Sequence, residues 1–167
     1  MTRLLAVLLA AAALFGAAPA HAYPTMPPNV SGPYTVLKVV DGDTIHVDVN
    51  GTKVKIREIG LDTPEVVDPR KPVQCFGREA SAQAKAVLAG QQVYLETDPS
   101  QDTVDKYGRT LAYVWVNGHL FNEDMIAAGY AFEYTYDLPY KYQAEFKAAE
   151  TGARVAQRGL WSPSACP

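Results

Sequence analysis

Side chains that bind metals through nitrogen or sulfur are scarce in this chain. Its 167 residues include only two cysteines, Cys75 and Cys166, and three histidines, His21, His46 and His119. Zinc sites usually take closely spaced pairs of such ligands, whereas these residues are scattered along the sequence. The sequence therefore excludes a zinc site of the usual spacing, and any metal bound by this chain should be a hard cation held by oxygen atoms.

An excess of positive charge is also lacking. The chain carries 15 lysines and arginines against 18 aspartates and glutamates, which gives a net charge of -3. Tight sequence-independent binding of nucleic acid depends on neutralising many phosphates and so favours a strongly basic surface. The charge balance argues against a module that only binds nucleic acid. It is compatible with an enzyme, which needs a local basic pocket around one phosphate and must release its product.

Only one long apolar run is present, and it lies at the N-terminus. Residues 4–15 are apolar, follow Arg3, and precede the small-residue segment Ala20-His21-Ala22, a combination typical of a secretory signal peptide. The run is shorter than the roughly 20 residues that span a bilayer. We therefore predict a signal peptide over residues 1–22, a secreted mature protein, and no membrane attachment after cleavage.

The two cysteines are expected to pair, because export delivers the chain to an oxidising compartment. A disulfide between Cys75 and Cys166 would tie the C-terminal tail to the middle of the chain. The chain-entropy model assigns the closure of so long a loop about 4 to 5 kcal/mol of stabilisation. The alternative is a pair of buried or free thiols, which the sequence leaves open.

The mature chain is long enough for one hydrophobic core and too short for two ordinary domains. Residues 23–33 hold four prolines, which is typical of an extended arm without a fixed fold. The expected domain therefore covers residues 34–167.

Hydrophobic periodicity predicts five strands and three helices in this domain. The expected strands cover residues 34–40, 44–49, 52–59, 92–97 and 111–116. The expected helices cover residues 77–89, 122–128 and 139–158, and a glycine follows each. Asn122 can cap the second helix, and Pro139 suits the first turn of the third. Because most strands come first and two helices come last, we predict an α+β fold with a partly open five-stranded barrel, and not a parallel sheet.

The second and third strands form a hairpin whose register can be predicted. Asn50-Gly51 is typical of a two-residue hairpin turn. Pairing across it gathers apolar residues on one face and sets Asp48 opposite Lys53 on the other. The expected pairs are Val49–Thr52, Asp48–Lys53, Val47–Val54, Ile45–Ile56 and Thr44–Arg57.

Four acidic residues lie near the ends of the expected strands. Asp41 and Asp43 belong to the sequence Asp-Gly-Asp-Thr, and Asp62 and Glu65 to the sequence Asp-Thr-Pro-Glu. Carboxylates at this spacing suit a hard cation such as calcium, which also takes backbone carbonyls and water. Aspartate, glycine, threonine and proline are also common turn residues, so two ordinary turns are the alternative interpretation.

Two arginines, Arg57 and Arg109, accompany these acids. In-line attack on a phosphodiester needs a cation to offset charge on the nonbridging oxygens, a base for water, and help for the leaving oxygen. Taken singly, Arg57 can be a strand arginine paired with a neighbouring acid, and Arg109 a turn residue after Gly108. Their joint occurrence with the four acids favours phosphodiester chemistry.

Three segments together resemble the staphylococcal nuclease (thermonuclease) family, and they occur in the family's order. They are residues 40–44 (Val-Asp-Gly-Asp-Thr), residues 57–65 (Arg-Glu-Ile-Gly-Leu-Asp-Thr-Pro-Glu) and residues 105–109 (Asp-Lys-Tyr-Gly-Arg). The resemblance extends from about Tyr34 to Trp161. It implies an OB-fold barrel with three helices, and a phosphodiesterase site that takes DNA and RNA as substrates and Ca2+ as cofactor.

The resemblance implies a metal site and a base. Asp43 and Asp62 would bind calcium together with the backbone carbonyl of Thr63. Glu65 would orient or deprotonate the attacking water. No covalent nucleophile is required.

The resemblance also implies which residues contact the substrate. Arg57 and Arg109 would clamp the phosphate, since a guanidinium fork matches the extra charge of the five-coordinate transition state better than an ammonium group does. The residues implied to hold the rest of the nucleotide are Lys71, Lys106, Tyr107, Tyr134 and Tyr136. The last two tyrosines could instead be core aromatics in a strand-like run.

The chain departs from the family's familiar pattern outside these residues. It carries the two cysteines, an acidic balance, the loop Asp-Pro-Arg-Lys-Pro over residues 68–72, and a final helix with few basic residues. We expect a monomeric, secreted, calcium-dependent nuclease. One alternative is a catalytically silent OB-fold module that binds nucleic acid or protein, and another is a secreted structural domain. A silent module would be expected to have lost one or more of Asp43, Arg57, Glu65 and Arg109, and none is lost.

Overall fold

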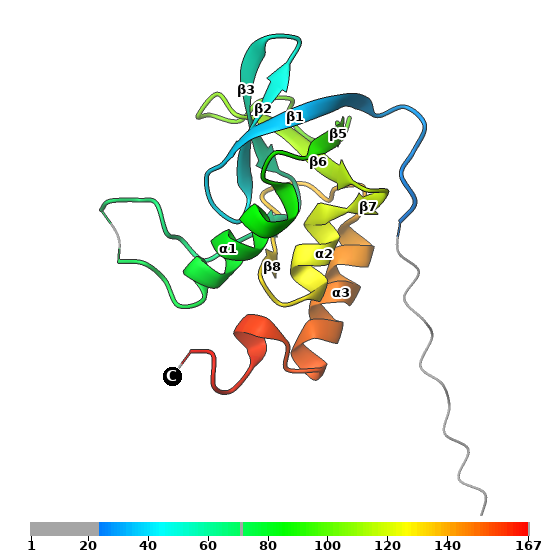
Figure 1. Ribbon diagram of the computed structural model, residues 1–167. Helices are drawn as coiled ribbons and strands as arrows, with labels where there is room; N and C mark the ends of the chain where they lie inside the picture. The colour runs from blue at the N-terminus through cyan, green and yellow to red at the C-terminus, as the bar shows by residue number, and fades with distance from the viewer. Residues whose placement is uncertain (1–23, 71, 167) are drawn as a thin grey trace, which may run out of the picture.

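The computed structural model describes residues 24–70 and 72–166, so the predicted signal peptide and Lys71 lie outside the described residues. Figure 1 shows a small barrel with three helices packed on one side of it. The helices are α1 (Gly77–Leu88), α2 (Phe121–Ala127) and α3 (Gln143–Val155). This arrangement confirms the predicted α+β class, with an OB-fold barrel of five strands and three helices.

Five strands form the barrel wall. They are β1 (Ser31–Val39), β2 (Thr44–Val49), β3 (Thr52–Glu58), β5 (Gln92–Glu96) and β6 (Thr110–Val116). Three two-residue strands accompany them: β4 (Leu61–Asp62), β7 (His119–Leu120) and β8 (Phe132–Glu133). The order is β3-β2-β1-β5-β6-β7, and a further pairing of β3 with β6 closes the barrel. The expected partly open barrel is therefore closed, because Ile56, Arg57 and Glu58 pair in parallel with the start of β6.

The β2–β3 hairpin has the predicted register. All five expected pairs are present, from Val49–Thr52 at the turn to Thr44–Arg57 at the far end. Asn50 and Gly51 both have positive φ angles, 53° and 85°, which a two-residue hairpin of this twist requires. Ile45, Val47 and Ile56 are fully buried inside the barrel. Arg57 consequently lies on the outer face, at the end of the hairpin away from the turn.

The first strand begins earlier than expected. It starts at Ser31 and not at Tyr34, because Ser31 pairs with Leu95 on β5 and its hydroxyl donates to the Leu95 carbonyl at 3.1 Å. The last residues of the proline-rich segment therefore belong to the barrel.

The predicted capping role of Asn122 is wrong. The side chain of Asn122 is fully buried and caps no helix. Its Oδ1 accepts from the backbone N–H of Val114, and its Nδ2 donates to the carbonyl of Ile59. A buried amide is stabilised by such partners, so Asn122 links α2 to β6 and to the chain after β3 instead.

The predicted start of the third helix at Pro139 is also wrong, because α3 begins at Gln143. Tyr140 and Tyr142 are buried beside Tyr113, and the backbone N–H of Lys141 donates to Asp98 at 2.8 Å. These contacts hold the segment before Gln143 in a non-helical path. Tyr113 on β6 also packs against Phe146 on α3, so this aromatic cluster joins the barrel to α3. In Figure 1, α2 and α3 lie below the barrel.

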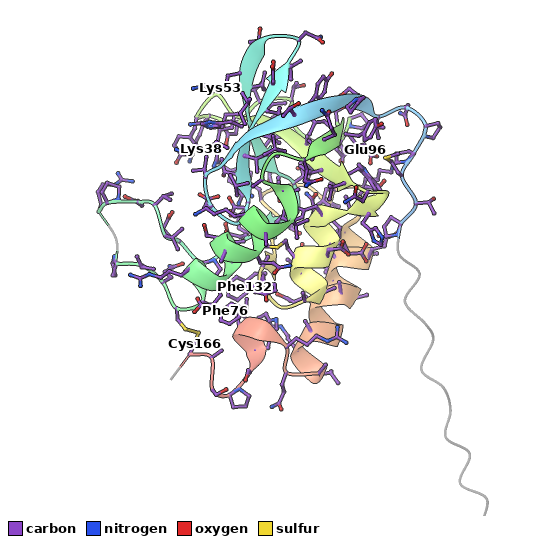
Figure 2. The ribbon with its side chains drawn as sticks, viewed as in Figure 1. Lys38, Lys53, Phe76, Glu96, Phe132 and Cys166 are labelled. Carbon is purple, nitrogen blue, oxygen red and sulfur yellow. A yellow bond between two sulfur atoms is a disulfide. The ribbon has the colours of Figure 1, made fainter. Side chains whose placement is uncertain are left out.

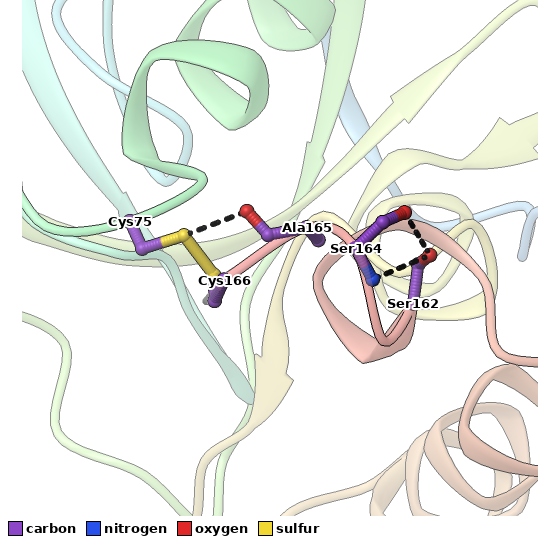
Figure 3. The surroundings of a disulfide bond; sticks show 5 residues. All are labelled: Cys75, Ser162, Ser164, Ala165 and Cys166. Atoms are coloured by element: carbon purple, nitrogen blue, oxygen red, sulfur yellow. Dashed lines mark hydrogen bonds between the residues drawn. A yellow bond between two sulfur atoms is a disulfide. The ribbon is translucent and has the colours of Figure 1, made fainter.

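The predicted pairing of the cysteines is present. Cys75 and Cys166 form a disulfide with a Cα–Cα distance of 5.8 Å (Figure 3). It joins the tail after the short 3-10 helix η1 (Gly159–Trp161) to the residue just before Phe76 and α1. None of the helices in the described part of the chain is long and apolar enough to cross a membrane.

Candidate active site

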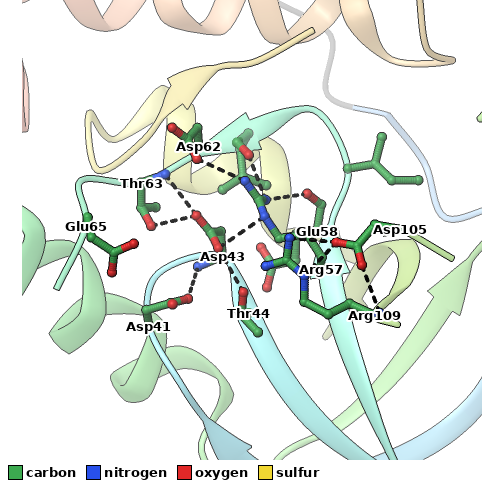
Figure 4. A network of polar contacts seen from close by, with 12 residues as sticks. Asp41, Asp43, Thr44, Arg57, Glu58, Asp62, Thr63, Glu65, Asp105 and Arg109 are labelled. Atoms are coloured by element: carbon green, nitrogen blue, oxygen red, sulfur yellow. Dashed lines mark hydrogen bonds and ion pairs between the residues drawn. The ribbon is translucent and has the colours of Figure 1, made fainter. Parts of the chain in front are cut away.

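Asp43 is the most buried of the four acidic residues in the two motifs. It lies in the turn between β1 and β2 and is only 7% exposed. Its Oδ1 accepts from the hydroxyl of Thr44 at 3.0 Å, and its Oδ2 accepts from the backbone N–H and the hydroxyl of Thr63 at 3.0 and 2.9 Å. A Cβ on Gly42 would come within 2.6 Å of the Thr63 side chain, so only glycine lets this turn approach so closely. Asp43 thus joins the two acidic motifs (Figure 4).

Arg57 connects the predicted calcium ligands to each other. Its Nε lies 3.4 Å from Asp43 Oδ1, and its Nη2 donates to Asp62 Oδ1 at 3.0 Å. Its Nη1 donates to the carbonyls of Glu58 and Leu61 at 2.8 and 2.9 Å. These contacts fix the guanidinium, and its positive charge offsets part of the negative charge of both aspartates. The alternative interpretation of Arg57 was a strand arginine paired with neighbouring acids. These ion pairs are present, and the same residue also lies between the predicted metal ligands.

Asp41 and Asp62 both have raised pKa values. Burial, and then the charge of Asp43, raises the pKa of Asp41 to about 7. Burial also raises the pKa of Asp62, against the opposing charge of Arg57. Such shifts arise where carboxyl groups are buried close to other carboxyl groups.

The donor set fits a hard cation. No three histidine, cysteine, aspartate or glutamate side chains converge on one point among residues 24–70 and 72–166. The predicted ligands Asp43, Asp62 and the Thr63 carbonyl are all oxygen donors, a mixed set that calcium accepts together with water. Half of the Asp62 side chain (51%) is exposed and open to such an ion.

Glu65 follows this cluster, and its carboxylate is held by its own loop. Its Oε1 accepts from the backbone N–H groups of Val66, Val67 and Asp68 at 2.8, 2.7 and 3.1 Å. No hydrogen bond to its Oε2 is found within the described ranges. One carboxylate oxygen is thereby oriented, and the other remains to act as an acceptor. The backbone of Glu65 is held by Gln74, from the far end of the loop.

Arg109 is positioned by Asp105, a residue of its own motif. Arg109 Nε donates to Asp105 Oδ2 at 2.7 Å, and its Nη2 lies 2.6 Å from the same oxygen. The backbone N–H groups of Tyr107 and Arg109 both donate to Asp105 Oδ1 at 2.9 Å. Burial alone would raise the pKa of Asp105, but these hydrogen bonds outweigh it and lower the pKa below its ordinary value. Asp105 therefore stays charged and fixes the turn that carries the arginine.

A pocket of about 660 Å³ brings most of the predicted site residues together. Its lining includes Arg57, Asp62, Lys106, Tyr107, Arg109, Tyr134 and Tyr136. Tyr134 and Tyr136 are 43% and 73% exposed, so their interpretation as core aromatics is wrong. Lys106 and Arg109 lie 5.2 and 5.3 Å from the centroid of the Tyr107 ring. Cations and flat aromatic faces at one opening suit a phosphate joined to a sugar and a base.

Not every predicted site residue lies in this pocket. Asp43, Thr63 and Glu65 do not line it. Asp43 contacts Thr63 and Arg57, and Glu65 lies beyond Thr63 on the side away from Arg57 (Figure 4). Lys71 lies outside the described residues.

The sequence interpretation assigned no role to Gln74, Asp105 or Glu58. The spacing of Asp105 four residues before Arg109 could have indicated their pairing, whereas nothing local marks Gln74.

Glu58 is fully buried, and neither of its oxygens has a hydrogen-bond partner within the described ranges. Burial, and then the charge of Asp43, raises the pKa of Glu58 well above its ordinary value. Burial in this position therefore disfavours the charged form of the Glu58 carboxyl.

The chain is thus a closed OB-fold barrel whose pocket combines two anchored arginines with exposed tyrosines. A family model described as "Staphylococcal nuclease homologue" matches residues 55–163. The chain is 45% identical to the thermonuclease of Staphylococcus hyicus over 129 residues. This aligned region covers 77% of this chain and 75% of that protein. It is 42% identical over 128 residues to the thermonuclease of Staphylococcus intermedius, again over 77% and 75%. It is 38% identical to endonuclease YncB of Bacillus subtilis over 131 residues, 78% of this chain and 62% of that protein. This chain belongs to the staphylococcal nuclease family.

Proposed function

We propose that this protein is a calcium-dependent nuclease that hydrolyses phosphodiester bonds of DNA and RNA by in-line attack of water. The observation that carries the proposal is the convergence of Arg57, Asp62 and Arg109 on one pocket, with Asp43 in contact with both Arg57 and Thr63. Relatives named thermonuclease and endonuclease, at 38% to 45% identity, support it.

The metal ligands and the base have separate tasks. Asp43, Asp62 and the Thr63 carbonyl would hold a calcium ion, which would supply positive charge to offset that of the phosphate. Glu65 accepts a proton from the attacking water through the carboxylate oxygen that its loop leaves open. The backbone bonds to its other oxygen keep the carboxylate from turning away.

The two arginines bind the phosphate. The Nε and Nη2 atoms of Arg109 both contact Asp105, and its Nη1 has no partner among the described residues. That group is free to donate to a phosphate oxygen. Arg57 has five N–H donors. Three form hydrogen bonds, Nε is ion-paired with Asp43, and one N–H of Nη2 remains. Both guanidiniums are pre-positioned and therefore stabilise charge that develops in the transition state at little reorganisation cost.

Cleavage assays with controlled metal test the proposal. Purified mature protein should degrade single-stranded DNA and RNA with calcium, lose activity after chelation, and recover it when calcium is restored. Magnesium should support less turnover, because it demands a stricter octahedral geometry. Full activity after exhaustive chelation would refute the metal assignment, and nucleic-acid binding without any cleavage would indicate the silent module.

We further propose that the chain is exported, loses residues 1–22, and acts as a monomer. The basic, apolar and small-residue parts of the leader and the disulfide between Cys75 and Cys166 support export. Intact-mass measurement of the protein recovered outside the cell should give a chain that begins at Tyr23. Sedimentation of the same sample should give the mass of one chain.

A further inference from the structure

A row of basic side chains crosses the outer face of the first three strands. In the sheet, Lys38 on β1 lies opposite His46 on β2, and His46 lies opposite Lys55 on β3. Residues directly opposite on neighbouring strands project from the same face, so these three side chains form one row. Lys38 and Lys55 are exposed. Lys53 lies on the same face nearer the hairpin turn, and Figure 2 labels it together with Lys38.

The row begins beside the phosphate clamp. Alternate residues of a strand share a face, so Lys53, Lys55 and Arg57 project outward, while Ile56 between the last two is buried. Same-face neighbours are separated by roughly 6.7 Å along a strand. Lys55 is therefore one such step from Arg57, and the basic row continues outward from the pocket.

Lys38 and Lys55 have no acid opposite them in the register of these strands. None of Lys38, Lys53 and Lys55 forms an ion pair with a carboxylate in the part of the chain that the structure describes. Asp48, opposite Lys53, is the one acid paired with these residues in the hairpin register. Burial, and then the charges of Lys53, Lys55 and Lys38, lowers the pKa of His46, as expected for a group set among cations. This concentration of positive charge lies on a chain whose net charge is -3.

We propose that Lys38 and Lys55, which flank His46 in this row, form a binding track for the phosphate backbone of a single-stranded polynucleotide whose scissile phosphate lies at Arg57. The inference rests on the proposed function and extends it beyond the nucleotide in the pocket. It explains how an acidic protein can hold a long substrate, because the positive charge is concentrated where the strand leaves the site. Lysines that contact phosphates distinguish no base, so the track binds without sequence preference.

Two double variants test the track. K38Q/K55Q removes two positive charges from the row, and K85Q/K147Q removes two from exposed positions on α1 and α3. Both have the same net charge, so general electrostatic attraction is matched. Circular dichroism and thermal unfolding should first show that both remain folded.

The measurement is equilibrium binding of a labelled 20-nucleotide oligothymidylate by fluorescence anisotropy, in chelator, over a series of salt concentrations. For K38Q/K55Q we expect binding weaker on the order of 10-fold at 50 mM salt, and a logarithmic salt slope shallower by about 1.4, or about 0.7 for each lost phosphate contact. K85Q/K147Q should match the unmodified protein. A dinucleotide competitor should bind all three proteins equally.

The outcomes separate the track from the proposed function. Equal affinity and equal salt slope for the two double variants would overturn the track, even if the protein cleaves DNA. A selective loss in K38Q/K55Q would support the track, and because the assay contains no calcium it does not depend on turnover. Failure of the unmodified protein to cleave any polynucleotide with calcium would refute the proposed function alone.

Discussion

Gln74 holds both backbone polar atoms of Glu65. The backbone N–H of Gln74 donates to the carbonyl of Glu65 at 2.9 Å, and the backbone N–H of Glu65 donates to Gln74 Oε1 at 2.7 Å. The next residue, Cys75, is tied to Cys166 by the disulfide. Gln74 thus joins the two ends of the loop that follows the candidate base Glu65. The disulfide at the next residue links this loop to the C-terminal tail.

Loss of the Gln74 side chain should therefore reduce turnover more than substrate binding. Because small misplacements of a catalytic group are costly, we expect Gln74→Ala to lower kcat on the order of 10- to 100-fold with little change in KM. Gln74→Glu keeps an oxygen acceptor and should recover part of the rate. Gln92→Ala, which removes an exposed glutamine bonded to Thr35 on the barrel, is the matched control.

The same prediction has an internal check. If Gln74 acts through Glu65, Gln74→Ala should cause little further loss in a protein that already carries Glu65→Gln. Additive losses would show that Gln74 acts by another route.

The disulfide should stabilise the protein and spare the chemistry. Replacing Cys75 and Cys166 together by serine should lower the free energy of unfolding by up to about 4 to 5 kcal/mol, because the bridge closes a loop of 91 residues. Neither sulfur has a role in the proposed reaction, so calcium-dependent cleavage should persist where the variant is folded. Denaturant unfolding measures the loss, and two reactive thiols in the denatured, exported protein would show that the bridge is absent.

Local patterns predicted much of the fold. The hairpin register and α1 (Gly77–Leu88) follow from alternation, from the Asn50-Gly51 turn and from helical spacing, which are all short-range. The errors occurred where contacts with residues distant in the sequence determine the local structure. Asn122 serves Val114 and Ile59 and not a helix end, and residues 139–142 are held by Asp98 and the aromatic cluster.

The site shows the same division. The acids and arginines lie in short motifs, so their identity was visible in the sequence. The part played by Gln74 was not, since it depends on a loop that returns to Glu65 nine residues later. The lysine row was equally hidden, because β1, β2 and β3 must pair before Lys38 and Lys55 flank His46.

Asp98 should make stability depend on pH in acid. It is 6% exposed, and burial alone would raise its pKa. Hydrogen bonds from the backbone of Lys141 and Ser100, and from the hydroxyls of Tyr113 and Ser100, outweigh burial and lower the pKa below the ordinary value of 3.8. A lowered folded-state pKa gives stability that is present above the ordinary value and is lost as pH falls through the folded value.

The change that tests this is Asp98→Asn, with exposed Asp102→Asn as the control. Asp98→Asn should cost about 2 kcal/mol of unfolding free energy at pH 7, because hydrogen bonds to a charged group are lost. The difference from the unmodified protein should shrink as pH falls below about 4. Urea unfolding over a pH series measures both effects, and a difference independent of pH would contradict the assignment.

Arg109 should be irreplaceable by lysine. Its Nε and Nη2 both lie against Asp105, which leaves Nη1 directed to other partners, and a lysine cannot make this forked contact. We expect Arg109→Ala to lower turnover by roughly 10² to 10³, the range seen when one transition-state donor is removed. Arg109→Lys should recover little of it. A lysine variant with near-normal kcat would show that only the charge matters.

The central claim, that this site hydrolyses phosphodiesters with Glu65 as base, is tested most directly by the turnover of Glu65→Gln on single-stranded DNA with saturating calcium. The loss of a general base predicts a fall in kcat on the order of 10² to 10⁴, with the fold and the affinity for DNA retained. A purified, folded Glu65→Gln protein that cleaves DNA within about threefold of the unmodified rate, well short of that general-base effect, would contradict the account.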